Sequence, residues 1–186
     1  MGRITFILGG ARSGKSSFAQ NLATRLSVGS AGGVTYLATA TAEDEEMELR
    51  IARHQDNRPA QWKTIEEPRY VAGALSGVNS AAVIVDCLTL LVTNIMLEQG
   101  ADQQDGSPDV EKLEQVVMRE IEEILSQCRR ILGQALLISN EVGMAVVPPT
   151  PLGRTFRDIA GRVNQRVAGE AEEVFFLLAG LAQKLK

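Results

Sequence analysis

The sequence predicts a single α/β domain with a doubly wound, mostly parallel sheet and helices on both faces. Short apolar runs alternate with amphipathic segments, as in folds whose parallel strands are joined by crossover helices. The chain length of 186 residues suits one domain, spanning residues 1–186. Residues 9–16 have the sequence GGARSGKS and match the phosphate-loop pattern G-x-x-x-x-G-K-[ST]. These three observations indicate a P-loop NTPase fold of the RecA-like class.

Apolar, β-branched runs mark the strands of this sheet, because a strand covered on both faces has no need of polar alternation. The sheet should have six or seven strands. We expect strands over residues 3–8, 34–38, 61–65, 81–87, 135–139 and 173–178, with a further edge strand over 183–186.

Helical periodicity and capping residues mark the connections between these strands. We expect helices over residues 16–26, 42–55, 69–75, 88–98, 110–132 and 152–169. Thr41 followed by Asp44 resembles a capping box, and Ser107-Pro108 resembles an N-cap followed by Pro at the first helical position. The apolar stripe of helix 110–132 indicates core packing rather than a coiled coil, since it spans only about three heptads.

The helix over 152–169 has one basic surface. The arginines on that surface are Arg154, Arg157, Arg162 and Arg166. The alternative to a binding surface is a solvated face, with Asp158 as an i+4 partner.

Composition and charge narrow the classes of function. The net charge is −4, which argues against nucleic acid as a partner because no basic excess exists to neutralise a phosphate backbone. Cys87 and Cys128 form no C-x-x-C motif, and we expect two reduced cysteines in a cytoplasmic protein. No apolar run reaches the roughly 18 residues that a membrane helix needs. The first segment is a strand running into a glycine loop, which is not the pattern of a signal peptide.

The phosphate-loop motif predicts the binding of a nucleoside triphosphate and Mg²⁺. Glycines let backbone N–H groups turn inward around phosphate oxygens, and the helix N-terminus adds its positive dipole end. Lys15 should reach the β- and γ-phosphates, and the Ser16 hydroxyl should bind Mg²⁺. The residues of this predicted site are Gly9, Gly10, Ala11, Arg12, Ser13, Gly14, Lys15 and Ser16. The alternative is a glycine-rich turn that matches by accident.

Two further residues are candidates for chemistry. Asp86 ends the apolar strand over 81–87, which is the Walker-B position whose carboxylate helps to hold Mg²⁺; the alternative is an acid that caps the next helix. His54 is the only histidine. Periodicity alone favours a helix-end residue packed beside Met47 and Ile51 over a catalytic one.

The phosphate loop alone does not distinguish a kinase from a GTPase switch or a motor protein. The chain lacks the guanine-reading N-K-x-D motif of a GTPase switch, and its basic surface is no larger than one helix face. A small-molecule kinase is therefore the plain interpretation of the residues.

Five motifs add a more specific resemblance. They are residues 9–16, RHQDNRPAQW at 53–62, Thr93-Asn94, SNEVGM at 139–144 and FRDIAGRVNQR at 156–166. With them, the whole chain resembles the bifunctional adenosylcobinamide kinase/adenosylcobinamide-phosphate guanylyltransferase family of cobalamin biosynthesis. The resemblance implies two reactions: ATP or GTP phosphorylates the aminopropanol hydroxyl of adenosylcobinamide, and GTP then guanylylates that phosphate, releasing pyrophosphate.

The resemblance also implies roles for residues. It makes His54 the nucleophile that carries GMP, and it implies a homotrimer. It places a guanine-nucleotide site at Thr39, Ala40, Thr41, Gln55, Asp56, Asn57, Arg58, Glu66 and Asp86. Three positions depart from the family pattern: Arg53 stands where a second histidine is frequent, Asn57 replaces a glycine, and Asp86 replaces a glutamate.

Three other functions stay open at this point. One is a guanylyltransferase without kinase activity, and another is a P-loop kinase of an unrelated metabolite in which His54 is structural. The third is a nucleotide-binding regulator that transfers no group.

Overall fold

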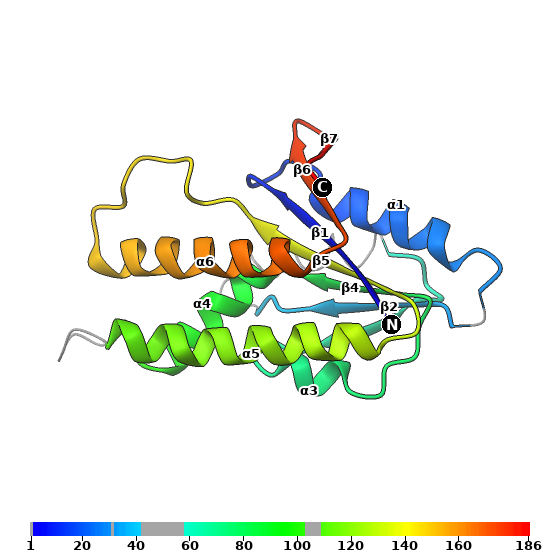
Figure 1. The fold of residues 1–186 in the computed structure, drawn as a ribbon, viewed down its shortest axis with the longest axis horizontal. Helices are drawn as coiled ribbons and strands as arrows, with labels where there is room; N and C mark the ends of the chain where they lie inside the picture. The colour runs from blue at the N-terminus through cyan, green and yellow to red at the C-terminus, as the bar shows by residue number, and fades with distance from the viewer. Residues whose placement is uncertain (1, 31, 42–57, 103–108) are drawn as a thin grey trace.

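The computed structural model of the chain describes residues 2–30, 32–41, 58–102 and 109–186. Its described strands lie side by side in one sheet (Figure 1). The sheet has seven strands in the order β3-β2-β4-β5-β1-β6-β7. They are β1 (Arg3–Gly9), β2 (Val34–Ala38), β3 (Lys63–Glu66), β4 (Ala82–Asp86), β5 (Gln134–Asn140), β6 (Glu173–Leu178) and β7 (Leu181–Lys184). Neighbouring strands are parallel except β6 and β7, which form an antiparallel hairpin. The predicted doubly wound, mostly parallel α/β fold is confirmed.

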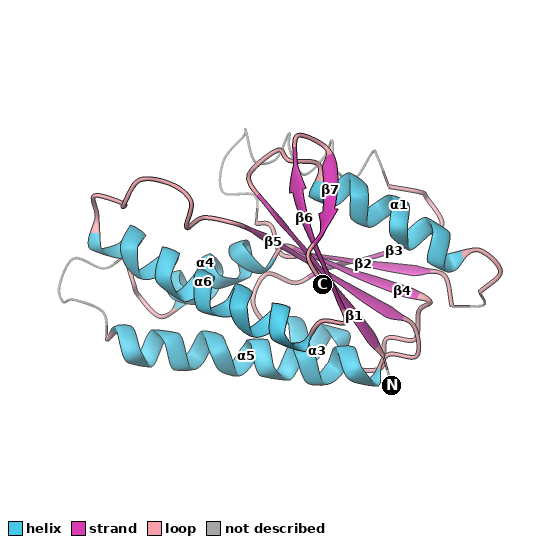
Figure 2. Ribbon diagram, turned by 45° about the horizontal axis from the view of Figure 1, so that its top comes forward, coloured by secondary structure: helices cyan, strands magenta, loops and turns pink. Residues whose placement is uncertain are grey.

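Helices cover both faces of the sheet, as the sequence predicts. The described helices are α1 (Lys15–Ser27), α3 (Val71–Leu75), α4 (Leu88–Glu98), α5 (Val110–Arg130) and α6 (Pro151–Glu170). Figure 2 shows α1 on one side of the sheet, and α3, α4, α5 and α6 on the other. The predicted helix over 42–55 lies outside the described residues.

Alternate residues of the central strands pack into two separate hydrophobic cores, one on each face of the sheet. On β4, Val83 and Val85 pack into the cluster beneath α4, α5 and α6, whereas Ile84 packs with Ala19 and Ala23 of α1. The same alternation holds along β5, because successive side chains of a strand point to opposite faces. The near-continuous apolar runs in the sequence therefore reflect a sheet that is buried on both sides.

The structure corrects several of the predicted boundaries, and β3 begins at Lys63, two residues after its predicted start. Helix α5 begins at Val110, and its cap is Asp109, whose carboxylate accepts a hydrogen bond from Lys112 N at 3.1 Å. The prediction of Ser107 as the N-cap is therefore wrong; both residue types suit a cap, and the structure uses the later one. The predicted edge strand over 183–186 is observed as β7, two residues earlier, after a turn through Ala179 and Gly180.

Two of the four arginines on the basic surface of α6 pair with acidic residues of α5. Arg162 pairs with Glu114, and Arg166 donates to Glu122 at 2.6 Å. The prediction of Asp158 as an i+4 partner is wrong, because Asp158 pairs with the adjacent Arg157. Arg154 donates to two carbonyls of the loop before α6, those of residues 148 and 149. Each of the four arginines therefore has a partner, and this surface is not an open cationic patch.

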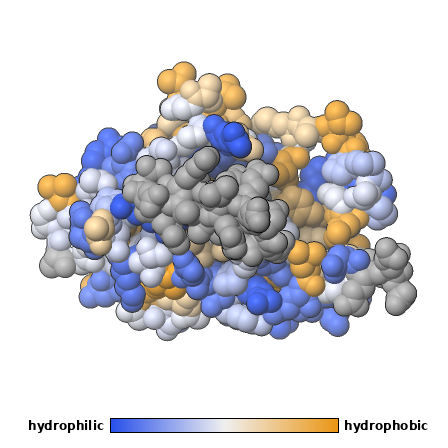
Figure 3. Space-filling model, turned by 180° about the vertical axis from the view of Figure 1, so that it is seen from behind, coloured by the Kyte–Doolittle hydropathy of each residue, from blue (hydrophilic) through white to orange (hydrophobic). Residues whose placement is uncertain are grey.

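Exposed apolar side chains gather on two projecting segments (Figure 3). Leu178 and Leu181 lie on the β6–β7 hairpin, and Met144 and Val146 lie in the loop before α6. None of the described helices combines the length and apolar character that crossing a bilayer requires.

We predict that Asp109→Ala lowers the free energy of unfolding by about 1 kcal/mol, because an orphan N–H of the first turn of α5 loses its acceptor. Urea-induced unfolding followed by circular dichroism measures the change. Asp109→Asn should retain most of the stability, since asparagine caps equally well. Ser107→Ala is the matched control and should leave the stability unchanged; a larger loss for Ser107→Ala than for Asp109→Ala would contradict the assignment.

Candidate active site

The glycine loop joins the carboxyl end of β1 to the start of α1. Gly14 caps α1 in the left-handed conformation, with φ of +95°, where a side chain would be strained. A Cβ at Gly9 would lie 2.4 Å from the carbonyl oxygen of Leu177 on β6. The loop is also held from the hairpin side, because Gly180 N donates to the Ser13 carbonyl at 3.0 Å. The loop is therefore fixed in shape by its neighbours.

Lys15 begins α1 and is folded back over the loop. Its Nζ donates to the carbonyl of Gly10 at 2.6 Å, and its side chain is buried. Burial lowers the pKa of Lys15, and the nearby Cys87 and Asp86 partly oppose that shift. The cation is thus held at the place where phosphate groups would meet the helix N-terminus.

Asp86, at the end of β4, gathers two hydroxyl groups on one carboxylate oxygen. Ser16 Oγ donates to Asp86 Oδ2 at 2.7 Å, and the Tyr36 hydroxyl donates to the same oxygen at 2.6 Å. Burial and the neighbouring carboxylate raise the pKa of Tyr36, so its hydroxyl remains a proton donor at neutral pH. The structure therefore brings together Ser16 and Asp86, the two residues predicted to hold Mg²⁺.

Arg58 stacks on the tyrosine that holds Asp86. Its guanidinium carbon lies 3.8 Å from the centroid of the Tyr36 ring, within the range of a cation–π contact. Its Nε and Nη1 atoms are buried and have no hydrogen-bond partner in the structure described here. Such donors suit a phosphate or carboxylate ligand, because guanidinium binds anions through a fork of N–H groups.

Thr39 ties the ends of two strands together. Its hydroxyl accepts from Cys87 N and donates to the Cys87 carbonyl, both at 2.8 Å. Asn94 of α4 donates to the Thr39 carbonyl at 2.8 Å and to that of Pro68 at 2.9 Å. The Thr39 side chain therefore supports the site from within the scaffold, and Asn94, singled out in the sequence, is a brace of that scaffold.

The segment after β5 braces the loop from the other side. Glu141 N donates to the Gly9 carbonyl at 3.0 Å, and Asn140 donates to Thr89 Oγ1 at 2.8 Å. Asn164 of α6 donates to the Asn140 carbonyl at 3.1 Å. Two of the sequence motifs, at 139–144 and 156–166, thus meet behind the loop.

The remaining predicted residues divide into two groups. Ala40 and Thr41 follow β2 and are half-buried, while Glu66 ends β3 and is exposed. His54 and the three residues after it, Gln55, Asp56 and Asn57, lie outside the described residues.

Sequence reasoning missed Tyr36. The residue is 1% exposed in the middle of β2, and a buried tyrosine hydroxyl almost always has a hydrogen-bond partner. That rule, applied to an aromatic residue within an apolar strand, could have indicated a polar group at the neighbouring strand end. It could not have identified Asp86 as that group, because the partner depends on strand order.

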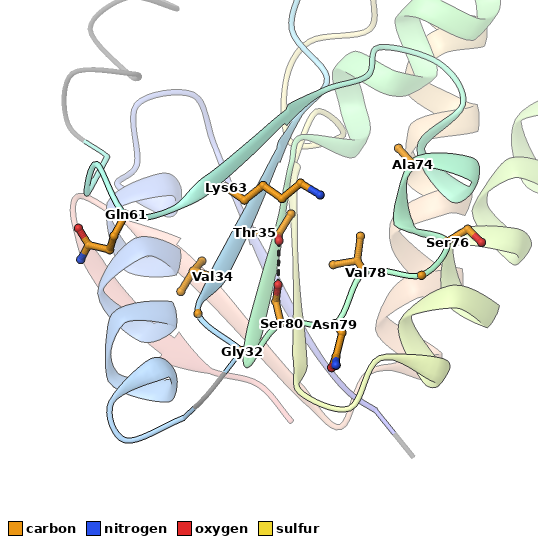
Figure 4. Close-up of a pocket in the computed structure, with 12 residues that line it drawn as sticks. Gly32, Val34, Thr35, Gln61, Lys63, Ala74, Ser76, Val78, Asn79 and Ser80 are labelled. Atoms are coloured by element: carbon orange, nitrogen blue, oxygen red, sulfur yellow. Dashed lines mark hydrogen bonds between the residues drawn. The ribbon is translucent and has the colours of Figure 1, made fainter.

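A separate cavity lies at the opposite, amino edge of the sheet (Figure 4). It has a volume of about 320 Å³ and is lined by residues at the starts of β2, β3 and β4, with the Thr35–Ser80 hydrogen bond of 2.8 Å in its wall. Its lining includes none of the predicted site residues. Within the described ranges, no group of three or more histidine, cysteine, aspartate or glutamate side chains could hold a metal ion. The carboxyl edge remains the candidate active site.

The chain is similar to known proteins over nearly its whole length. A family model described as cobinamide kinase / cobinamide phosphate guanyltransferase matches residues 5–185. The chain is 38% identical to the bifunctional adenosylcobalamin biosynthesis protein CobU of Escherichia coli strain K12, over 97% of this chain and 98% of the relative. It is 39% identical to CobU of Salmonella typhimurium, with the same coverage, and 42% identical to the bifunctional protein CobP of Pseudomonas aeruginosa, over 97% of this chain and 95% of the relative.

We predict that the stability of the wild-type protein rises with pH relative to that of Lys15→Met. The folded-state pKa of Lys15 is lowered below 10.5, so between the two pKa values the unfolded chain binds more protons than the folded one. Urea unfolding of both proteins from pH 7 to pH 10.5, without nucleotide or metal, measures the difference. Other titrating groups cancel in the comparison, and a difference that stays constant across this range would contradict the assignment.

Proposed function

This chain belongs to the cobinamide kinase / cobinamide phosphate guanyltransferase family, and from that premise we propose how it carries out both reactions. It is a bifunctional enzyme of cobalamin biosynthesis. We propose that it first phosphorylates adenosylcobinamide and then transfers GMP from GTP to adenosylcobinamide phosphate. The observation that carries the proposal is the grouping of Lys15, Ser16 and Asp86 at one edge of the sheet.

In the kinase step, the phosphate loop holds ATP or GTP with its γ-phosphate beside Lys15. The aminopropanol hydroxyl of adenosylcobinamide attacks the γ-phosphorus, and the bond from that phosphorus to the bridging oxygen breaks. The products are adenosylcobinamide phosphate, the nucleoside diphosphate and one proton. Lys15 favours this step because its charge is fixed before the reaction and neutralises charge on the transferred group.

Ser16 and Asp86 fit a Mg²⁺ ion. Both offer oxygen atoms, which this ion prefers, and one or two carboxylates with substrate phosphates usually complete its site. The Ser16 hydroxyl can donate its proton to Asp86 and still offer a lone pair. When bound, Mg²⁺ supplies charge neutralisation for the phosphates of the nucleotide.

In the guanylyl step, a neutral imidazole nitrogen of His54 attacks the α-phosphorus of GTP. The bond from the α-phosphorus to its bridging oxygen breaks, and pyrophosphate leaves. A phosphate oxygen of adenosylcobinamide phosphate then attacks the same phosphorus, the nitrogen–phosphorus bond breaks, and adenosylcobinamide-GDP forms. An imidazole with an ordinary pKa near 6.5 is mostly neutral at pH 7 and is therefore available as a nucleophile.

Arg58 supports a role for this segment in nucleotide binding. It stands four positions after His54 in the sequence. Its guanidinium, with buried donors, stacks on the ring of Tyr36, whose hydroxyl donates to Asp86. We therefore propose that Arg58 binds a phosphate of GTP. With it we group Ala40, Thr41, Gln55, Asp56, Asn57 and Glu66 of the predicted guanine-nucleotide site, while Thr39 supports that site from within the scaffold.

Assembly and location are extensions of the same proposal. We propose a homotrimer, by resemblance to the family, and a cytoplasmic enzyme. Cys87 and Cys128 are both free and buried, which is compatible with a reducing compartment.

We predict that His54→Ala abolishes guanylyl transfer and leaves the kinase step intact. Protein incubated with GTP labelled at the α-phosphate should retain label that is lost in acid and survives base, and the variant should retain none. Phosphorylation of adenosylcobinamide by ATP is the internal control and should stay within about threefold of wild type, because the γ-phosphate does not pass through the histidine. Label in the variant would remove His54 from the mechanism.

We predict that Lys15→Met lowers kcat of the kinase step by roughly 10²–10³-fold, the usual cost of removing one preorganised group that stabilises transition-state charge. The assay follows adenosylcobinamide phosphate at saturating ATP. Arg25→Met, a change at the opposite end of α1, is the matched control for losing one cation from the same helix. Equal rates for Lys15→Met and Arg25→Met would contradict the role of the loop.

A further inference from the structure

We propose that Tyr36 is a positioning residue that holds Asp86 in the orientation needed for metal binding, an inference that rests on the proposed Mg²⁺ role of Ser16 and Asp86. Tyr36 belongs to neither the phosphate loop nor any motif of the sequence. Its hydroxyl makes the 2.6 Å hydrogen bond to Asp86 Oδ2, and its ring lies under Arg58.

The backbone fixes the direction from which Tyr36 acts. Tyr36 pairs with Ile84 in the register of β2 and β4, two positions before Asp86 on the neighbouring strand. Two positions along a strand return to the same face of the sheet. The ring packs in the core with Ile84 and Leu136, so the phenol is a rigid arm with its hydroxyl at the carboxylate.

The two hydroxyl donors leave the carboxylate with a defined orientation. Ser16 and Tyr36 both donate to Oδ2, so rotation of the Asp86 side chain would break both bonds. The other oxygen, Oδ1, takes part in neither bond. A metal binds more favourably to a carboxylate whose orientation is already fixed by hydrogen bonds than to one that must be ordered on binding.

The ring and the hydroxyl of Tyr36 have different partners, so an experiment can test them separately. The ring of Tyr36 makes the cation–π contact with Arg58, whereas its hydroxyl makes the hydrogen bond to Asp86. Tyr36→Phe removes the hydroxyl and keeps the ring, so the surface under Arg58 and the packing of the core are retained. A purely structural role predicts a loss of stability alone; the positioning role predicts a loss of metal affinity.

The test measures nucleotide binding rather than turnover. Calorimetric titration with α,β-methylene GTP, which cannot transfer GMP, gives its dissociation constant in Mg²⁺ and in chelator. The dissociation constant in chelator divided by that in Mg²⁺ is the metal-dependent gain in affinity. We expect Tyr36→Phe to reduce this gain about tenfold, the usual lower range for losing a group that orients a metal ligand. Its affinity without metal should stay within about twofold of wild type.

Thr35→Val is the matched control. It removes a buried hydroxyl from the adjacent position of β2, where Thr35 bonds Ser80 at 2.8 Å in the wall of the amino-edge cavity. This variant should keep the full metal-dependent gain. An undiminished gain in Tyr36→Phe would overturn the positioning role and leave the proposed function standing, whereas no gain in the wild type would overturn the Mg²⁺ site and this inference together.

A second measurement needs no variant of Tyr36. The chain has two tyrosines, and Tyr70 is 61% exposed. With 3-fluorotyrosine incorporated, Tyr70→Phe assigns the two fluorine resonances. Adding Mg²⁺ to the complex with the GTP analogue should shift the Tyr36 resonance and leave that of Tyr70 in place. A Tyr36 resonance that does not respond to the metal would overturn the proposal.

Discussion

Parallel pairing of the central strands is the constraint on which the site depends. It brings the carboxyl ends of β1, β2, β4 and β5 to one edge of the sheet, where ligands bind in open α/β folds. Gly9 lies in register with Asn140, and Ala38 with Asp86. A shift of one residue in either pairing would turn each side chain to the other face and separate the hydroxyls from the carboxylate that they hold.

Around this edge, neutral groups support the site and leave its cations available. Thr39, Asn94 and Asn140 make their bonds to backbone or hydroxyl groups, so the scaffold uses no ion pairs at these points. Arg162 and Arg166 are paired with acids of α5, whereas Lys15 and Arg58 form no ion pair within the described residues. Within that part of the chain, Lys15 and Arg58 are therefore not neutralised by an ion pair at the edge where phosphate groups would bind.

Local patterns in the sequence predicted the elements well, because strand and helix periodicities and the loop glycines act over a few residues. They also singled out Ser16, from the loop motif, and Asp86, from the acid that ends an apolar strand, and the structure brings these two residues together. The hydrogen bonds of Tyr36, Asn94 and Asn140 could not be predicted in this way, because each joins segments whose proximity is decided by strand order. The prediction of the α5 N-cap was wrong for a different reason. Several nearby residues can cap a helix, and the structure uses Asp109.

The place of β1 within the sheet also bears on how the protein is made. This apolar strand is flanked by β5, which begins at Gln134, and by β6, which begins at Glu173. At roughly 5–20 residues per second of synthesis, β1 waits on the order of ten seconds or more before either neighbour leaves the ribosome. During that interval its edges are unpaired, and unpaired apolar strand edges are prone to association with other chains.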